Sequence, residues 1–231
     1  MVGGNARRII SRRTRPAKAP LSREVIVTTA LEILERGGLS NLSLRRIAAV
    51  LDTGAASLYV YVEDLAALHA LMLDEALATA KPAKTRNGSW RDRLKEFLLS
   101  YLHELLKRPG LAQLALSIIS TGPNAMRIRE QLFGLLKEGG VEDARAAWGV
   151  DLLTLYATTI AAEQDKRRAA GHGLGGVRKA LSAAAEVVLP LTSPLKETQL
   201  AGDSEAHLHW ALAVILNGFE RTKEISCNRE G

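Results

Sequence analysis

Several features that the chain lacks exclude whole classes of protein before any motif is considered. It has a single cysteine, Cys227, which cannot form an internal disulfide, and this suits a reducing compartment. No uninterrupted run of about 18 apolar residues occurs, so the sequence predicts no membrane span. The arginine-rich N-terminus lacks the apolar core of a secretory signal. We therefore expect a cytoplasmic protein.

Aromatic residues are also scarce, at 4%, while alanine and leucine are abundant. This composition favours helices over sheets. All seven prolines fall at the ends of helical patterns or between them, where a missing backbone N–H is tolerated. A chain of 231 residues has room for one or two domains with a proper core. The predicted fold class is all-α.

Acidic residues are absent from residues 1–20, which we call the basic arm. The arm contains six cations, Arg7, Arg8, Arg12, Arg13, Arg15 and Lys18. The remaining charges cancel, so the net charge of +6 belongs entirely to the arm. Its apolar content is too low for it to fold alone, so we expect disorder. Its charge density suits the neutralisation of phosphates, although a solubilising tail is the alternative.

The stretch from Ser43 to Val62, S-L-R-R-I-A-A-V-L-D-T-G-A-A-S-L-Y-V-Y-V, predicts a helix-turn-helix. Ser43 is placed to cap the first helix. One apolar stripe of this helix is formed by Leu44, Ile47, Ala48 and Leu51. Asp52-Thr53-Gly54 is typical of a turn, with short polar side chains followed by a glycine that can adopt a positive φ. The second helix opens on small residues that allow close approach to a phosphate chain or a groove, namely Ala55, Ala56 and Ser57.

Two other interpretations of this stretch stay open from the residues alone. One is an ordinary helical hairpin inside an all-helical protein. The other is a strand over Leu58 to Val62, because alternating aromatic and β-branched residues favour strands. The strand is disfavoured because the sequence contains no second run with which it could pair.

The stretch resembles the DNA-binding domain of TetR-type transcriptional repressors. The resemblance covers Leu21 to Leu77 and includes the preceding helix L-S-R-E-V-I-V-T-T-A-L-E-I-L-E-R-G-G-L, then S-L-R-R-I-A, A-A-S-L-Y and E-D-L-A-A-L-H-A-L. It implies DNA contacts from Ser43, Arg45, Arg46, Ala55, Ala56, Ser57, Tyr59 and Tyr61. Because the basic arm directly precedes this domain, we also expect contacts to DNA from Arg12, Arg13 and Arg15.

The chain departs from the family pattern at two places. The turn usually reads Leu-Gly-Val-Ser, whereas here Leu51 is followed by Asp52-Thr53-Gly54. The fourth helix usually starts with a lysine that contacts phosphate, and here Leu65 occupies that position behind Glu63 and Asp64. This phosphate contact is therefore absent or supplied from elsewhere.

The rest of the chain predicts further helices with glycine- or proline-rich breaks. The domains we predict are the basic arm at 1–20, a helix-turn-helix domain at 21–64, and a helical ligand-sensing and dimerisation domain at 65–231. The family resemblance implies a ligand cavity in the last domain, whose filling changes the spacing of two DNA-reading heads. The residues we expect to form its wall are Phe97, Tyr101, Trp148, Leu152 and Tyr156. Asp151 and Glu163 are candidate partners of a cationic ligand, with simple exposure as the alternative.

The last predicted helix, from Ser204 to about Lys223, carries two apolar faces. The face suited to the protomer's own core consists of Leu208, Leu212, Ile215, Leu216 and Phe219. Small residues at Ala211, Val214 and Gly218 form a neighbouring strip that lets another helix approach closely. With a long helix over Val141 to Arg168, this one would form a four-helix interface across a two-fold axis. The expected interface residues are Ala211, Val214, Ile215 and Gly218; packing inside one protomer is the alternative.

Catalytic and cofactor patterns are weak. Gly171 to Gly176 matches G-x-G-x-x-G, but it follows a polar helix end and not a strand. His207 and His209, two apart on a helix, point in different directions and cannot share a metal. We predict no cofactor and no metal site.

The predicted function is that of a cytoplasmic, homodimeric, ligand-responsive repressor that a small molecule releases from a palindromic operator in double-stranded DNA. The alternatives are a DNA-binding regulator without a ligand and, more remotely, a small all-helical enzyme.

The basic arm provides a first test. Deleting residues 1–20 should weaken binding to operator and to random DNA by similar factors, because phosphate contacts carry no sequence information. It should also flatten the dependence of log affinity on log salt concentration, as fewer counterions are released. Fluorescence anisotropy over a salt series measures both. An unchanged salt slope would reduce the arm to a solubilising tail.

Overall fold

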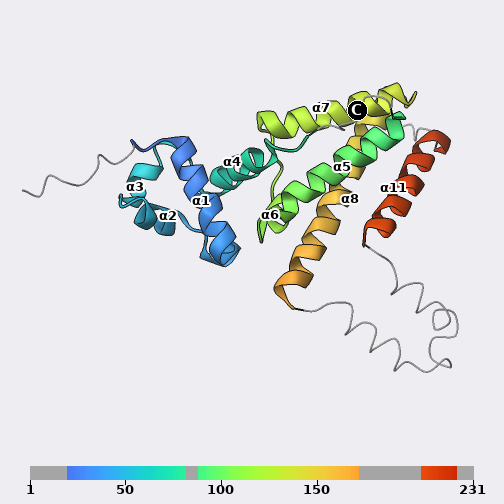
Figure 1. Ribbon diagram of the computed structural model, residues 1–231. Coiled ribbons are helices and arrows are strands. Elements are labelled where there is room, and N and C mark those ends of the chain that lie inside the picture. Colours follow the sequence, from blue (N-terminus) through green and yellow to red (C-terminus); the bar gives the residue numbers. More distant parts are fainter. Residues whose placement is uncertain (1–19, 82–87, 172–203, 223–231) are drawn as a thin grey trace, which may run out of the picture.

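The computed structural model describes residues 20–81, 88–171 and 204–222 of the chain. Within these ranges the protein consists of nine α-helices and one 3-10 helix, with no strand (Figure 1). The all-α prediction is confirmed. The strand considered for Leu58 to Val62 is wrong, since these residues form the end of a helix and the turn after it.

The N-terminal head, residues 20–64, contains α1 (Arg23–Gly37), η1 (Leu39–Asn41), α2 (Leu44–Val50) and α3 (Ala55–Leu58). Serine hydroxyls cap the first two α-helices, at Ser22 and, as the sequence predicted, at Ser43. The Ser22 hydroxyl accepts from the Val25 amide at 3.3 Å, and Ser43 accepts from the Arg46 amide at 3.2 Å. Residues from all three α-helices make the core of the head, among them Ile26, Ala30, Leu34, Ile47 and Leu58.

The predicted turn between α2 and α3 is confirmed, but its glycine does not use its freedom to adopt a positive φ. Asp52, and not Gly54, takes the positive φ, at 49°. The amides of Asp52 and Thr53 bond back to the carbonyls of Ala49 and Ala48 at 3.2 and 2.9 Å, the pattern of a Schellman helix end. Aspartate tolerates the left-handed region because its short side chain is polar. Gly54, with φ −78°, is left to begin α3 as its N-cap residue.

Helix α4 (Leu65–Leu77) joins the head to the rest of the molecule. The Asp64 carboxylate caps it by accepting from the Ala67 amide at 2.7 Å. The helix packs against α1 in the head and against α5, α6 and α7 beyond it (Figure 1). Buried residues therefore occur around much of its circumference, namely Leu68, Met72, Leu73, Asp74, Ala76 and Leu77.

The body consists of α5 (Trp90–Leu106), α6 (Leu111–Ser117), α7 (Pro123–Glu138), α8 (Asp143–Ala169) and α11 (Ser204–Arg221). Helix α8 is central, because α5, α6, α7 and α11 all pack against it. One apolar core runs from the head through α4 into the body. The sequence also predicts a helix over residues 177–189. This segment, most of the glycine-rich segment 171–176, nearly all of the basic arm, and Cys227 lie outside the described residues.

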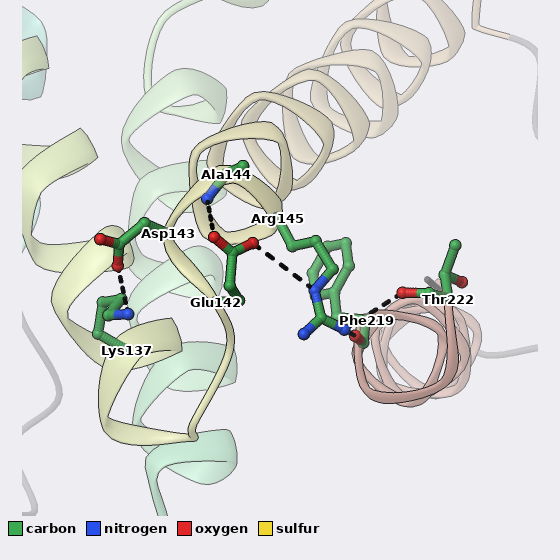
Figure 2. A network of polar contacts seen from close by, with 7 residues as sticks. All are labelled: Lys137, Glu142, Asp143, Ala144, Arg145, Phe219 and Thr222. Carbon is green, nitrogen blue, oxygen red and sulfur yellow. Dashed lines mark hydrogen bonds and ion pairs between the residues drawn. The ribbon is translucent and has the colours of Figure 1, made fainter. Parts of the chain in front are cut away.

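Polar contacts hold the end of α11 against the start of α8 (Figure 2). The Arg145 guanidinium donates to the carbonyls of Phe219 and Thr222 at 3.1 and 3.2 Å, and so satisfies acceptors at the end of α11. Glu142, which caps α8 through the Ala144 amide, lies 4.0 Å from Arg145. The expected inner face of α11 is confirmed: Leu208, Leu212 and Leu216 are buried, and Ile215 and Phe219 pack partly against the core.

A buried carboxylate on α4 caps the beginning of α7. Asp74 accepts from the Ala125 amide at 2.9 Å and from the Asn124 side-chain amide at 3.1 Å. The carboxylate packs so closely on Gly122 that a Cβ there would overlap it. In return, Arg127 of α7 donates to the carbonyls of Leu77 and Ala80 at 3.2 Å each. We call these contacts the α4–α7 clasp.

The clasp makes a prediction about stability. Asp74→Ala leaves the Ala125 amide buried without its acceptor, so the free energy of unfolding should fall by about 1–3 kcal/mol. Urea denaturation followed by circular dichroism measures it. The neighbouring Glu75 is exposed, so Glu75→Ala should stay within about 0.5 kcal/mol of wild type. Equal losses in the two variants would contradict this role of Asp74.

Candidate nucleic-acid interface and internal cavity

Helix α2 turns a polar side to solvent while its apolar side lies in the core of the head. Ile47 and Ala48 are buried, and Arg45 and Arg46 are exposed. Ser43 is half-buried, with its hydroxyl engaged as the helix cap. Both arginine side chains are thus free to extend toward a partner, on a helix anchored from its other side.

Helix α3 is a single turn, and its exposed residues are the small ones. Ala56 and Ser57 are exposed, whereas Ala55 packs partly against the core and Leu58 is fully buried. The Tyr59 side chain, next along the chain, is 57% exposed. An aromatic ring with a hydroxyl, held this far out of the core, can contact phosphates or base edges.

Tyr61 lies closer to the core than its sequence pattern indicated. Its side chain is half-buried against the core, and its carbonyl accepts from Arg23 Nε at 3.4 Å. Arg23, the exposed first residue of α1, therefore places a cation beside the end of the helix-turn-helix. The sequence pattern missed Arg23, because its position next to Tyr61 depends on how α1 crosses the motif.

The head carries no excess of positive charge. Residues 20–64 contain four arginines and six acidic residues, the latter Glu24, Glu32, Glu35, Asp52, Glu63 and Asp64. Leu65, in the position where the family pattern has lysine, packs partly against the core. Exposed cations for a phosphate backbone are therefore confined to a few positions in the described head, and the basic arm that precedes it lies outside the described residues.

A cavity of about 300 Å³ lies where α4 meets the body. Five helices and the segment after α6 contribute to its wall: α4, α5, α6, α7 and α8. The lining residues are Leu73, Leu77, Tyr101, Ala115, Leu116, Ile118, Ile119, Ser120, Ala125, Ile128, Arg129, Thr154, Leu155 and Thr158. A cavity of this size, mostly apolar with a few polar groups, has the character of a small-molecule site.

Of the five expected wall residues, Tyr101 alone lines this cavity. Phe97 belongs to the core at 1% exposure, while Trp148 and Leu152 are exposed on the outside of α8. Tyr156 packs partly against the core away from the cavity. Asp151 and Glu163 are both exposed and pair with Arg129 and Arg167. Helical periodicity cannot tell which apolar side of a helix meets an enclosed space and which meets another helix.

The polar part of the cavity wall lies on α5, α7 and α8, and at Ser120 in the segment after α6. The Tyr101 hydroxyl is 2.7 Å from Thr158 Oγ1, and Arg129 reaches the cavity while pairing with Asp151. Burial raises the pKa of the Tyr101 phenol, against the opposing effects of its bond to Thr158 and the Arg129 charge. The phenol is therefore neutral at physiological pH. The one sequence feature that could have indicated this wall is the four-residue spacing of Thr154 and Thr158 on one helix.

The outer sides of α8 and α11 expose large apolar residues in the described part of the chain. These are Trp148, Leu152 and Leu155 on α8, and Trp210 and Val214 on α11. Ala211 and Gly218, beside Val214, are half-buried, and a Cβ added at Gly218 would meet open space. Ile215 packs partly against the protomer core. Exposed apolar side chains of this size on two neighbouring helices are typical of a surface that another protein covers.

Among the residues that the structure describes, no three histidine, cysteine or acidic side chains are grouped as a metal site would require. None of the described helices combines the length and apolarity needed to cross a bilayer.

Comparison with known proteins decides the family. Residues 81–223 match the model of the tetracyclin repressor-like, C-terminal domain. The HTH-type transcriptional repressor DrrR1 of Streptomyces coeruleorubidus is 30% identical to the chain over 219 residues, which are 89% of this chain and 81% of that protein. The chain belongs to the TetR family. The resemblance predicted from residues 21–77 thus extends into the body.

Solved TetR-family structures agree with this membership over nearly the whole chain. Apo ActR from Streptomyces coelicolor is 33% identical, with a TM-score of 0.79, covering 88% of this chain and 96% of its own. ActR in complex with actinorhodin gives a TM-score of 0.80 at the same identity, covering 87% and 98%. The chain is accordingly a ligand-responsive, DNA-binding transcriptional regulator, as the sequence predicted.

Arg45 and Tyr59 provide a test of the DNA-facing surface. Both are exposed, so Arg45→Ala and Tyr59→Ala should each weaken DNA binding by about tenfold or more, the cost of a lost charge-assisted or aromatic contact. Their melting temperatures should stay near that of wild type. Electrophoretic mobility shift and differential scanning fluorimetry measure the two effects.

Lys137 serves as the control for loss of a positive charge, because it lies far from the head on α7 and pairs with exposed Asp143. Lys137→Ala should leave DNA affinity nearly unchanged. A Tyr59→Ala or Arg45→Ala protein that unfolds, or one that binds like wild type, would remove that residue from the interface.

Proposed function

We propose that this TetR-family chain acts as a homodimeric repressor that holds a palindromic operator until a small molecule enters the cavity beside α4. In this proposal Arg45, Arg46, Ser57 and Tyr59 meet the DNA, and the basic arm adds phosphate contacts. The chain performs no catalysis and works in the cytoplasm, where its DNA partner lies.

The observation that carries the proposal is the shared position of α4. The helix packs on α1 inside the head, and its residues Leu73 and Leu77 form part of the cavity wall. A molecule that fills the cavity therefore touches the same rigid element that supports the DNA-reading head. Because a helix is a rigid element, a displacement of α4 at the cavity also displaces the part of α4 that packs on the head.

Two contacts convert changes in the cavity into movement of the head. One is the α4–α7 clasp, which lies next to the lining residues Ala125 and Ile128. The other is Gly110 before α6, whose amide donates to Asp165 at 2.6 Å and where an added Cβ would press against Leu34 and Leu39 of the head. With φ of 86°, position 110 favours glycine. Ligand binding that favours one arrangement of these contacts shifts the spacing of two heads.

The dimer in this proposal uses the exposed apolar sides of α8 and α11. One helix-turn-helix buries too little surface for operator-level affinity, so two heads act about 34–36 Å apart on one face of the DNA. Trp148, Leu152, Trp210 and Val214 supply the apolar area for a four-helix interface. The Arg145 contacts at the base of α11 keep the two interface helices in register (Figure 2).

The sequence left open, as an alternative, a regulator without a small-molecule ligand. The cavity favours the sensing function over it, because a protein that only bound DNA would gain stability from a filled interior. ActR, similar over nearly its whole length, has been solved in complex with actinorhodin.

Gly218→Arg tests the dimer and the palindromic operator together. An added side chain there meets open space within the protomer, so the variant should fold, yet its charge would lie in the proposed interface. Wild type should elute as a dimer and should enrich an inverted repeat from a random DNA pool. The variant should elute as a monomer and enrich no repeat, with affinity reduced at least about a hundredfold.

Gly134→Arg is the matched control, because Gly134 is also a helical glycine with open space around it, on α7 outside the proposed interface. It should remain dimeric with normal affinity. A dimeric Gly218→Arg protein would place the interface elsewhere, and a wild type that enriches no inverted repeat would refute the operator proposal.

A further inference from the structure

The polar groups of the cavity differ in whether they still have a proton to donate. Thr158 Oγ1 donates its single proton to the Thr154 carbonyl at 2.7 Å. The Tyr101 hydroxyl, 2.7 Å from Thr158 Oγ1, must therefore donate to it. The Thr154 hydroxyl proton is likewise used by the Val150 carbonyl at 2.8 Å. The Tyr101 and Thr154 oxygens can therefore only accept further hydrogen bonds, so a ligand that binds them must supply a donor.

Two other lining residues offer protons. The Ser120 hydroxyl is buried and has no hydrogen-bond partner among the described residues. Leaving a buried hydroxyl unpaired costs about 1–3 kcal/mol, so a group that accepts from it is favoured. Arg129 has five N–H groups, of which described residues engage only those on Nη2, through Asp151. A ligand that binds Ser120 and Arg129 must therefore supply a hydrogen-bond acceptor, and the charge of Arg129 favours an anionic acceptor.

The Arg129–Asp151 pair can exchange its carboxylate for that of a ligand. The two side chains are 42% and 62% exposed. An ion pair this accessible contributes at most about 1 kcal/mol, because water screens it. The attraction between Arg129 and a ligand carboxylate in the cavity is less screened by water. The ligand carboxylate would therefore displace Asp151 from Arg129.

The remaining wall is apolar and includes side chains that water now reaches. Ile119 is 89% exposed, Leu155 is 60% exposed and Leu116 is 44% exposed. A ligand body that covers them removes apolar surface from water, at about 25 cal/mol per Å². The volume of about 300 Å³ lies at the lower end of the range for small-molecule pockets, which suits a compact ring system.

We infer that the effector is a compact hydroxylated apolar carboxylic acid, whose carboxylate binds Arg129 and Ser120 and whose hydroxyl donates to Tyr101 or Thr154. A phosphate ester fits less well, because its additional anionic oxygens would find no further cation among the described lining residues. The inference rests on the proposed function, since it takes this cavity as the effector site.

The test uses the purified full-length protein and isothermal titration calorimetry with three related probes. They are a hydroxynaphthoic acid with its two groups at opposite ends of the rings, its methyl ester, and naphthoic acid without the hydroxyl. Wild type should bind the hydroxy acid about tenfold more tightly than the ester, the value of a charge-assisted hydrogen bond. The hydroxyl should add a few-fold in affinity, by the same reasoning for a neutral bond.

Variants assign each preference to a residue. Arg129→Gln should bind acid and ester equally, and Tyr101→Phe should bind the probes with and without hydroxyl equally. Asp151→Asn should bind the acid more tightly than wild type, since it removes the competing carboxylate. Arg167→Gln is the matched control: Arg167 is 43% exposed and also paired with an exposed carboxylate, Glu163, but lies outside the cavity. It should bind like wild type.

Three results would overturn the inference: equal binding of acid and ester to wild type, an acid preference that survives in Arg129→Gln, or no binding of any probe at millimolar concentration. DNA affinity of the same preparations, measured without any probe, separates this failure from that of the proposed function. If the protein binds its operator but shows no preference for the carboxylate, only the inferred ligand class is refuted. If it binds no DNA, both the inferred ligand class and the proposed function are refuted.

Discussion

Burial of α4 on opposite sides is the constraint on which the rest of the structure depends. A helix that is covered by α1 on one side and by α5, α6 and α7 on others cannot shift without changing contacts in both head and body. Asp74 strengthens this link, because a buried carboxylate must keep its hydrogen-bond donors, here the Ala125 amide and the Asn124 side chain. A displacement of α4 therefore affects both the head and the cavity wall, to which Leu73 and Leu77 contribute.

The cavity and the DNA-facing surface rely on opposite uses of polarity. In the cavity, helix carbonyls already accept the protons of a small number of hydroxyl groups. This fixes where a ligand must donate and where it must accept a hydrogen bond, and so limits the chemistry of the ligand. On the head, Arg45, Arg46 and Tyr59 are exposed in a unit that carries no overall excess of positive charge. In the proposed function, the basic arm supplies the charge that attracts DNA from a distance, and the head supplies the geometry of recognition.

The proposed interface and the protomer core lie side by side on α11. Ile215, which the sequence placed on both faces, packs partly against the protomer core, while Val214 next to it is exposed. A helix turns by 100° per residue, so neighbouring residues readily serve different faces. The Arg145 bonds to the end of α11 hold this division in place, because rotation of the helix would exchange the two faces.

The sequence by itself determined the helix starts at Ser22, Ser43 and Asp64, the all-helical class and the family, because caps and apolar periodicity act over a few residues. Tertiary structure decided the rest. Asp52 rather than Gly54 took the positive φ because the backbone bonds that close α2 reach back from Asp52 and Thr53. The cavity wall was predictable only at Tyr101, since a partly open cavity arises where five helices fail to meet, and no local pattern in one helix records the position of the other four.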